Sequence, residues 1–395
     1  MSTPPVPASE ELISMLLEAG ALTSEWAPAF RKLPRSAFLP EVMWAFDTRT
    51  GQSSLVDRTA SPEPWTYWAT ADAPITVQWD DGAYGSPRQG TVPTSSASMP
   101  SVVASMLRDL DAHPGMTVLE PGTGTGWNAA LLAHRLGPHA VTGIEADPEI
   151  ARTARDNLRQ VAGDVHVVTG DGLLGAPDRA PFDRVIATFG LRTVPAAWVA
   201  QTRPGGILLV PWGTDFSPQD AVARLVVAED GLSASGRFTG LVQFMKARSQ
   251  RLEWPDDERH VHDWPGRTST TSLGADDVAP TAPYGPRPFV LGLLVDGAAQ
   301  VRHDDKDGTV LWIYSLTGRS WAAAVVDGDT GAGRVHQAGP RSLWSEVEAA
   351  WNWWDGQGRP GVEESGLTVT ADGAQRAWPG APDRLLSKEA GRRPR

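Results

Sequence analysis

The chain has 395 residues, of which 41% are hydrophobic, so it is long and apolar enough for two domains with buried cores. Its formal net charge is −12 and it has no basic run, which makes nucleic acid a poor candidate partner. It contains no cysteine, and this excludes disulfides, thiolate zinc sites and a cysteine nucleophile.

The N-terminal segment from Met1 to Pro5 lacks the basic start and the apolar centre of a signal peptide. No apolar run approaches the length that crosses a bilayer. We therefore expect a cytoplasmic protein without a membrane partner. The sequence leaves its oligomeric state open.

The first elements are predicted to be helical. Residues 10–19 carry an apolar stripe, and Ser24 is a candidate cap for a second helix that reaches about Lys32. The stretch 44–90 then holds several aromatic residues among polar and turn residues, including Trp65, Tyr67, Trp68, Trp79 and Tyr84. Two interpretations stay open, namely aromatic packing onto the domain, and a lid or peptide-binding wall.

A serine-rich segment, Thr94 to Pro100, precedes a predicted helix from about Ser101 to Leu110. Serines in front of a helix are commonly N-caps, so this segment alone does not indicate a site.

The stretch from Val118 to Ala133 is predicted to be a buried strand, a glycine turn and a helix. This arrangement places free backbone N–H groups at a helix N-terminus, beside a nucleotide-like ligand. The dinucleotide fingerprint would need glycine at position 127, where Trp127 stands. The observed pattern is acid-x-G-x-G-x-G with Glu120 as the acid, and it resembles motif I of the S-adenosylmethionine (SAM) methyltransferases.

Strands and helices alternate from there to about residue 213. The predicted strands are 141–145, 165–172, 182–188, 207–210, 223–227 and 236–244, with helices at 151–158 and 195–201. The pattern predicts an α/β fold, a Rossmann-like class I methyltransferase with a mostly parallel sheet. Ligands bind at the carboxyl ends of such strands, where Glu120, Glu145, Asp171 and Thr188 fall.

The C-terminal part is predicted to be an α+β extension. Residues 251–284 are rich in Pro, Asp, Thr and Ser and indicate a linker or long loop. His260 and His262 lack an evident third ligand, so no metal is expected. Beyond them we predict strands at 289–295, 310–314, 321–326 and 367–370, and a helix at 343–354 capped by Ser342. The expected units are 1–95 (N-terminal helical and lid region), 96–250 (SAM-binding core), 251–284 (linker or long loop) and 285–395 (C-terminal α+β domain, a candidate for peptide-substrate recognition).

Several motifs in one order carry a more specific resemblance. They are Arg35-x-x-Phe38-x-Pro40, Ser96-Ala97-Ser98-Met99-Pro100, Gly170-Asp171-Gly172-x-x-Gly175, Ala180-Pro181-Phe182-Asp183-Arg184-Val185, Val194-Pro195 and Gln201-x-x-Pro204-Gly205-Gly206. Over about Leu33 to Gly213 the chain resembles protein-L-isoaspartate O-methyltransferase. The resemblance implies SAM as cofactor, S-adenosyl-L-homocysteine as product, and a peptide with aspartate or isoaspartate as partner.

The resemblance also implies the site. Glu120 and the glycine turn would hold the methionine end of SAM, Glu145 the ribose, and Asp171 the adenine. The implied cofactor-binding residues are Glu120, Gly122, Thr123, Gly124, Trp127, Asn128, Glu145, Ala146, Asp171, Gly172, Leu173 and Thr188. Ser98 is the implied catalytic residue, and Ser96, Ser98, Val194 and Pro195 are the implied substrate-binding residues. Met99 departs from the Gln or Ala that the family commonly has before the proline.

Two features favour a narrower hypothesis. About 145 residues follow Gln250, whereas repair members of the family are typically compact. The residues within the motifs also resemble those of actinobacterial relatives that accompany ribosomally made peptides such as lanthipeptides, lasso peptides and graspetides. We therefore hypothesise methylation of aspartate in a macrocyclic peptide, leading through a succinimide to aspartimide or isoaspartate. General isoaspartate repair is the alternative, and a SAM-binding protein without turnover is a third possibility. Deletion after Gln250 is expected to abolish peptide methylation while SAM still binds.

Overall fold

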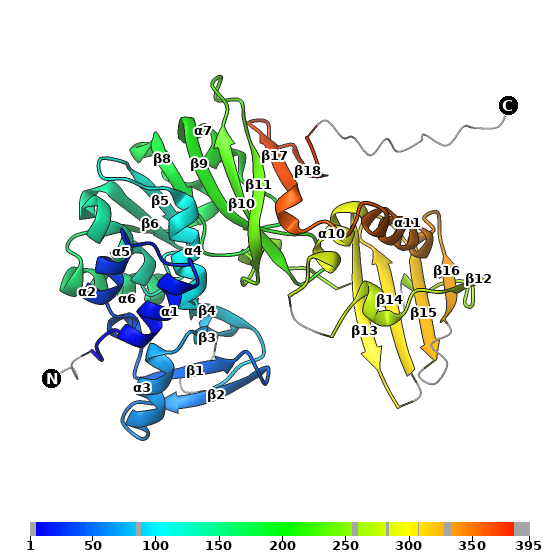
Figure 1. Ribbon diagram of the computed structural model, residues 1–395, viewed down its shortest axis with the longest axis horizontal. Coiled ribbons are helices and arrows are strands. Elements are labelled where there is room, and N and C mark those ends of the chain that lie inside the picture. The colour runs from blue at the N-terminus through cyan, green and yellow to red at the C-terminus, as the bar shows by residue number, and fades with distance from the viewer. Residues whose placement is uncertain are drawn as a thin grey trace.

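The computed structural model describes residues 5–83, 88–254, 260–281, 284–306, 308–327 and 333–382. Within these residues a nine-stranded sheet runs through the centre of the molecule, with two smaller sheets beside it (Figure 1). One half of the central sheet is parallel and the other half antiparallel. In spatial order its strands are β18 (Gln375–Pro379), β17 (Ser365–Thr370), β11 (Ser233–Val242), β10 (Asp220–Val227), β9 (Thr202–Trp212), β8 (Phe182–Ile186), β5 (Val118–Pro121), β6 (Val141–Glu145) and β7 (His166–Thr169).

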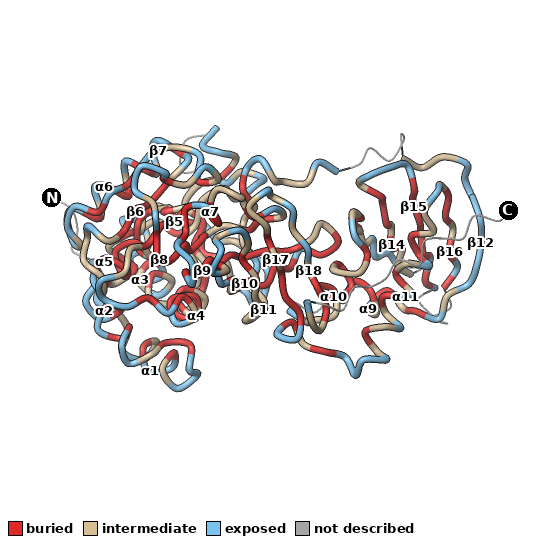
Figure 2. Tube along the Cα trace, turned by 90° about the horizontal axis from the view of Figure 1, so that it is seen from above, coloured by how far each residue is buried: buried red, intermediate tan, exposed pale blue. Residues whose placement is uncertain are grey.

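The inner parallel strands are buried on both faces because helices cover both faces. Every residue of β5 and β8 is buried, and the buried segments run through the middle of the molecule in Figure 2. One face packs against α1 (Glu10–Glu18), α2 (Ala27–Lys32), α4 (Pro100–Leu110), α5 (Trp127–Leu136) and α6 (Pro148–Val161). The other face packs against α7 (Ala196–Ala200) and reaches α10 (Pro286–Leu294). The predicted α/β, Rossmann-like fold class is confirmed.

The N-terminal region forms an antiparallel sheet in the order β2 (Gln52–Asp57), β1 (Val42–Asp47), β3 (Ile75–Trp79) and β4 (Pro93–Ala97), with α3 (Pro62–Thr70) against it. Trp44, Trp65 and Trp79 are buried, and the partly buried Trp68 packs against the core of this region. Tyr67 is 63% exposed, and Tyr84 lies outside the described residues. The serine-rich segment is largely the edge strand β4, and no serine side chain caps α4, whose N-cap is Met99.

Arg35, in the short helix η1 (Arg35–Phe38), connects this region to the core. Its buried guanidinium donates five hydrogen bonds of 2.7–3.3 Å to main-chain carbonyls, those of Trp68, Ala69, Ala71, Ala73 and Ser98. Burial lowers the pKa of Arg35 to about 10, so it stays charged at neutral pH. The backbone of Ser98 is thereby fixed to the end of α3.

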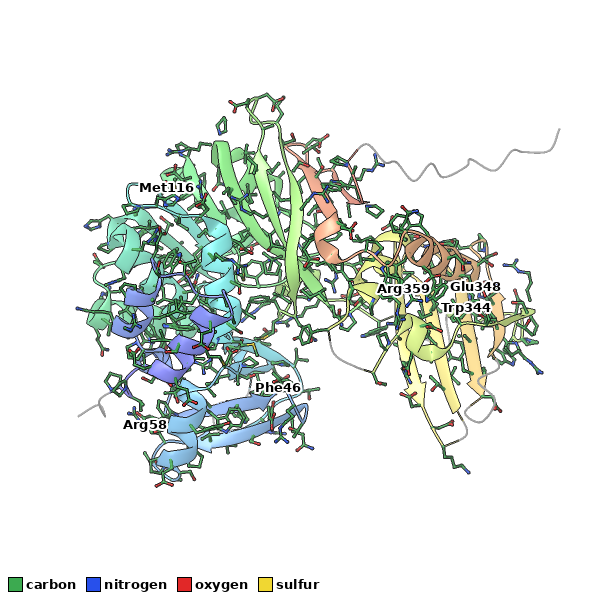
Figure 3. The ribbon with its side chains drawn as sticks, viewed as in Figure 1. Phe46, Arg58, Met116, Trp344, Glu348 and Arg359 are labelled. Carbon is green, nitrogen blue, oxygen red and sulfur yellow. The ribbon has the colours of Figure 1, made fainter. Side chains whose placement is uncertain are left out.

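The C-terminal region has a five-stranded antiparallel sheet in the order β12 (Arg267–Thr271), β16 (Gly333–Ala338), β15 (Trp321–Asp327), β14 (Gly308–Ser315) and β13 (Ala298–Asp304). One face packs on α9 (Ala275–Val278), α10 and α11 (Leu343–Gly356). Glu348 on α11 accepts hydrogen bonds from the indole N–H of Trp344 (3.1 Å) and from the hydroxyl of Thr271 (2.8 Å), which ties α11 to β12 (Figure 3).

Three details of the predicted elements are wrong. Ser24 does not cap α2, which begins at Ala27 after Trp26. The apolar run 289–295 is helix α10 rather than a strand, because a fully buried helix and a buried strand have the same apolar pattern. Pro286 and Pro288 lie in its first turn, where a missing N–H breaks no helical hydrogen bond. The expected linker 251–284 contains β12 and α9.

The predicted strand at 367–370 is confirmed, but its partner is unexpected. β17 pairs with β11 and β18 pairs with β17, so both strands complete the central sheet rather than the C-terminal one. The expected unit 285–395 is therefore divided between two sheets. Among the described residues, no helix is both long enough and apolar enough to span a bilayer.

Candidate active site

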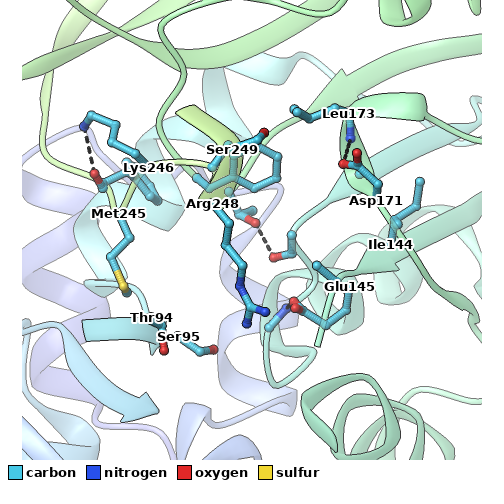
Figure 4. Close-up of a pocket in the computed structure, with 18 of the residues that line it drawn as sticks. Thr94, Ser95, Ile144, Glu145, Asp171, Leu173, Met245, Lys246, Arg248 and Ser249 are labelled. Atoms are coloured by element: carbon cyan, nitrogen blue, oxygen red, sulfur yellow. Dashed lines mark hydrogen bonds between the residues drawn. The ribbon is translucent and has the colours of Figure 1, made fainter. Parts of the chain in front are cut away.

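A pocket of about 450 Å³ opens at the carboxyl ends of β5, β6 and β7, beside the residues that follow β8. Its wall combines β4, the glycine turn after β5, the ends of β6 and β7, and the segment 244–251 (Figure 4). Nine of the residues predicted from the sequence line it: Ser96, Gly122, Gly124, Glu145, Ala146, Asp171, Gly172, Leu173 and Thr188.

The turn after β5 requires glycine. Gly122, Gly124 and Gly126 have φ angles of 91°, 56° and 98°, in the left-handed region that other residues rarely adopt. A Cβ atom on Gly122 would lie 2.6 Å from both the Thr188 hydroxyl and the Phe189 ring. A Cβ on Gly124 would meet no atom closer than 3.8 Å, so at this residue the loop presents bare backbone to the pocket.

Glu145 joins this turn to the end of β6. Its carboxylate accepts the Gly124 N–H (2.9 Å) on one oxygen and the Asp147 N–H (3.0 Å) on the other. Since each carboxylate oxygen has two lone pairs, Glu145 can still accept the hydroxyls of a ribose. Asp171 accepts the Leu173 N–H (2.9 Å) at the start of the short helix η4 (Gly172–Leu174) and keeps acceptor capacity toward the pocket.

Glu120 lies beneath the glycine turn and does not line the pocket. It is fully buried, and this desolvation raises its pKa to about 8. The Asn128 side chain donates a hydrogen bond to Oε1 (2.7 Å), which opposes the rise in pKa but does not cancel it. No donor among the described residues reaches the buried Oε2. Glu120 therefore acts on the pocket through the turn and Asn128.

A small adjoining cavity of about 50 Å³ contains most of the remaining predicted residues. It shares Ser96, Gly122, Gly124 and Thr188 with the pocket, and Ser98, Thr123, Trp127 and Asn128 also line it. The Trp127 side chain is mainly a packing group, because its N–H donates to the Leu33 carbonyl (2.9 Å) and its ring packs edge-on against Phe30.

Two predicted substrate-binding residues lie elsewhere. Val194 is fully buried and its N–H donates to the Gln375 side chain of β18 (3.0 Å), while Pro195 precedes α7. Neither lines the pocket or the small cavity, so the structure does not bring them to the site.

The segment 244–251 contributes three cations that the sequence predictions missed: Lys246, Arg248 and Arg251. The signal was present as three basic residues within six positions of an acidic chain. Figure 4 shows Arg248 pointing into the pocket, and its guanidinium pairs with Asp81 (2.9 Å) and Asp147 (3.3 Å).

The three cations have carboxylate partners. Arg251 makes a two-pronged pair with Asp81 (2.7 and 2.9 Å), which holds the pKa of that carboxyl below its usual range. Lys246 pairs with the buried Asp220 (2.5 Å), and burial lowers the pKa of Lys246. These pairs connect the pocket wall to the N-terminal sheet on one side and to β10 on the other.

Comparison with known proteins gives a consistent result. The family model described as protein-L-isoaspartate(D-aspartate) O-methyltransferase matches residues 61–245. Protein-L-isoaspartate O-methyltransferase of Thermococcus onnurineus is 39% identical over 176 residues, which cover 44% of this chain and 73% of the relative. The chain belongs to the protein-L-isoaspartate(D-aspartate) O-methyltransferase family.

Other members of the family match to different extents. The Methanopyrus kandleri protein is 35% identical over 210 residues, which cover 52% of this chain and 77% of the relative. The Pyrococcus horikoshii protein is 42% identical over 135 residues, which cover 34% of this chain and only 60% of the relative. Members of this family are SAM-dependent carboxyl O-methyltransferases, and the predicted enzyme class and cofactor are confirmed at this level.

A solved structure named protein-L-isoaspartate O-methyltransferase aligns with a TM-score of 0.53 and 22% identity, and covers 94% of this chain and 99% of its own. The shared fold therefore includes the C-terminal region, which we had expected to lie outside the family resemblance. A C-terminal extension alone consequently does not distinguish a peptide-tailoring enzyme from other members of this family.

Proposed function

We propose that the chain transfers the methyl group of SAM to a side-chain or α-carboxylate of an aspartate-derived residue in a polypeptide, with isoaspartate as the first substrate to test. The observation that carries the proposal is the composition of one pocket wall. Glycine-turn backbone, Glu145 and Asp171 lie on the cofactor side, and serines of β4 with Lys246, Arg248 and Arg251 complete the wall. The names of the relatives support isoaspartate.

The residues present fit SAM. Gly124 leaves room for a ligand against the backbone, and Glu145 and Asp171 have acceptor capacity for ribose hydroxyls and an adenine amine. When bound, SAM supplies a methyl group on a sulfonium that a carboxylate oxygen can displace. The chain's own task is then to hold the carboxylate in line with that methyl group.

An aspartate-derived carboxylate is already ionised at neutral pH, so no general base is required. Orientation alone can supply about 7–11 kcal/mol of the barrier reduction. Arg248 and Lys246 lie in the wall as hydrogen-bond donors, and their charges are balanced by Asp81 and Asp147 for Arg248 and by Asp220 for Lys246. The hydroxyls of Ser96 and Ser98 are available to orient the carboxylate oxygens.

The methyl ester is the starting point of a further reaction. The backbone nitrogen that follows the esterified residue attacks the ester carbonyl, loses its proton and expels methanol, which closes a succinimide. Water then opens the ring to aspartate or isoaspartate. Repeated cycles convert isoaspartate to aspartate.

The second candidate is the methylation of ordinary aspartate in a constrained, ribosomally made peptide. The residues at Ser95–Pro100 and Gly124–Ala133, which resemble those of peptide-tailoring relatives, favour this second candidate. The same pocket serves either substrate, because both present a carboxylate on a short tether to a peptide backbone.

Mass spectrometry of two peptide sets incubated with the protein and SAM tests the proposal. One set holds linear isoaspartyl peptides and the other holds macrocycles with ordinary aspartate. Addition of one methyl group to the linear isoaspartyl set supports the first substrate. Modification of the macrocycles alone, by a methyl group or by loss of water, supports the second. SAM binding without transfer to either set would overturn the proposed activity.

A further inference from the structure

A second cavity, of about 440 Å³, lies where the loop between β9 and β10 meets the C-terminal region. We call it the Trp254 groove, and its apolar walls are Phe216, Pro218, Leu252, Trp254, Pro280 and Val301. A volume of this size is ordinary for a ligand site. None of its residues belongs to the site predicted from the sequence.

The groove and the active-site pocket share structural elements. Arg251 lines the pocket and the next residue, Leu252, lines the groove, so one short segment borders both cavities. Lys246 of the pocket also reaches Arg192 of the groove through the buried Asp220, with distances of 2.5 and 2.9 Å. These shared elements place the groove beside the pocket, on the path that residues flanking a pocket-bound carboxylate would follow.

The charged groups of the groove are already neutralised. Arg192 pairs with Asp215 (2.8 Å), and Arg302 pairs with Asp304 (2.9 Å) and with Asp276. What the groove offers a ligand is therefore its apolar wall. Trp254 lines this wall and is 55% exposed, so its ring is accessible to a ligand in the groove.

One polar group of the groove is unsatisfied. The side-chain oxygen of Gln300 is buried, and the described part of the chain provides no hydrogen-bond donor to it. Buried acceptors are normally paired, so this oxygen calls for a donor from outside, such as a backbone N–H. An apolar wall with one unpaired acceptor is suited to a peptide segment that carries an apolar side chain.

We propose that the Trp254 groove binds the polypeptide segment flanking the methylated residue, with an apolar or aromatic side chain against Trp254 and a backbone N–H on Gln300. This inference rests on the proposed function, since it assigns the flank of that same substrate. It makes the enzyme selective for sequence several residues from the reacting carboxylate.

The test compares a short isoaspartyl tetrapeptide with peptides extended on either side by about four residues, each spanning roughly 3.3 Å. The extensions carry either leucine and tryptophan or serine. The variant is Trp254→Ala, and the matched control is Trp264→Ala, because Trp264 is 56% exposed and does not line the groove.

We expect Trp254→Ala to raise KM for an apolar extended peptide about tenfold, as truncation of an interface tryptophan commonly does. KM for the tetrapeptide and Kd for SAM should not change, and Trp264→Ala should alter none of the three. Gln300→Leu, which keeps the side-chain volume, should weaken the extended peptide alone. N-methylation of the peptide nitrogen that contacts Gln300 removes the same hydrogen bond. The effects of Gln300→Leu and of this N-methylation on KM should therefore not be additive.

The two proposals fail differently. If the wild-type protein binds SAM but methylates no peptide, both the proposed function and the groove assignment are overturned. If the protein methylates peptides but Trp254→Ala and Gln300→Leu act equally on short and extended ones, or on neither, only the groove assignment is overturned. Loss of a dimer in Trp254→Ala by light scattering, without an effect on peptides, would overturn it in favour of a second copy of the chain.

Discussion

Glu120 is a carboxyl group withdrawn completely from water beneath the glycine turn. Burial raises its pKa to about 8 from the ordinary 4.5. At neutral pH the folded protein therefore holds most of this residue in the protonated form, while the unfolded chain has released the proton. Folding stability is accordingly linked to pH through Glu120.

The sign of this linkage gives a prediction for Glu120→Gln. Between the unfolded value of 4.5 and the folded value of about 8, the folded state binds one more proton, so the free energy of unfolding decreases as pH rises. The slope is at most about 1.4 kcal/mol per pH unit. Urea denaturation at pH 5 and pH 8 should show a larger loss of stability for the wild type than for Glu120→Gln. Parallel losses would mean that Glu120 is ionised in the folded protein.

Asp171→Ala tests the proposed adenine end of the pocket. The substitution removes the acceptor for the Leu173 N–H and the acceptor capacity toward the pocket. We expect Kd for SAM to rise about tenfold by calorimetry, the size of one lost hydrogen bond to a charged group. Asp171→Asn keeps one acceptor oxygen and should lose less. Unchanged affinity in the alanine variant would place the adenine elsewhere.

The sequence predicts a site residue correctly where a local pattern, such as an apolar strand followed by an acid, defines its position. Glu145 and Asp171 each follow an apolar run, and the carboxyl ends of parallel strands meet at one edge, so their common location follows from the sequence. Arg248 and Arg251 reach the pocket only because the chain after β11 crosses over it, and no local pattern shows a crossing. Trp127 is predicted to bind the cofactor from its place in the motif, but the motif does not show which way a side chain points. In the structure its ring packs against Phe30 of α2.

At the scale of elements, Arg35 holds several segments together with one side chain. A lysine has three donors on a single atom and cannot reproduce a planar group that serves five carbonyls. We expect Arg35→Lys to lower the free energy of unfolding by about 3 kcal/mol or more, because buried carbonyls lose their donors.

Activity should fall in the same variant as the backbone of Ser98 loosens, and denaturant titration with kcat measurement checks both effects. The control is Arg31→Lys, whose ion pair with Glu10 (3.1 Å) is exposed and should change stability by less than about 0.5 kcal/mol. Equal effects of the two substitutions would remove Arg35 from this connecting role.

The elements themselves differed in how well the sequence predicted them. The predicted 141–145 strand matches β6, because a turn signal brackets each end of its apolar run. Helix α10 was missed because tertiary burial, rather than amphipathic periodicity, makes it apolar: Phe289, Val290 and Leu291 are all fully buried. Edge strands such as β12 are exposed along most of their length and carry little pattern.

At the scale of the whole molecule, the return of the chain to the central sheet changes the expected outcome of truncation. A chain ending at Gln250 would lose β17 and β18, and it would also lose Phe289, Val290 and Leu367 from the core on the α7 face of the central sheet. We expect it not to unfold cooperatively in calorimetry, and therefore not to retain SAM binding as the sequence had led us to expect. A chain lacking only residues 383–395 keeps the described pairings of both strands and should show a normal transition. A truncated 1–250 chain with a sharp transition would contradict this.

The pairing of β11 with β17 also has a consequence for how the protein is made. β11 ends at Val242, and its partner begins at Ser365, about 120 residues later. At roughly 5–20 residues per second, the ribosome needs on the order of ten seconds to deliver that partner. During this interval the emerging sheet has an unpaired edge, the kind of surface that joins to other chains. Synthesis at high concentration should therefore be more hazardous for this protein than refolding of the finished chain, in which β17 is present from the start.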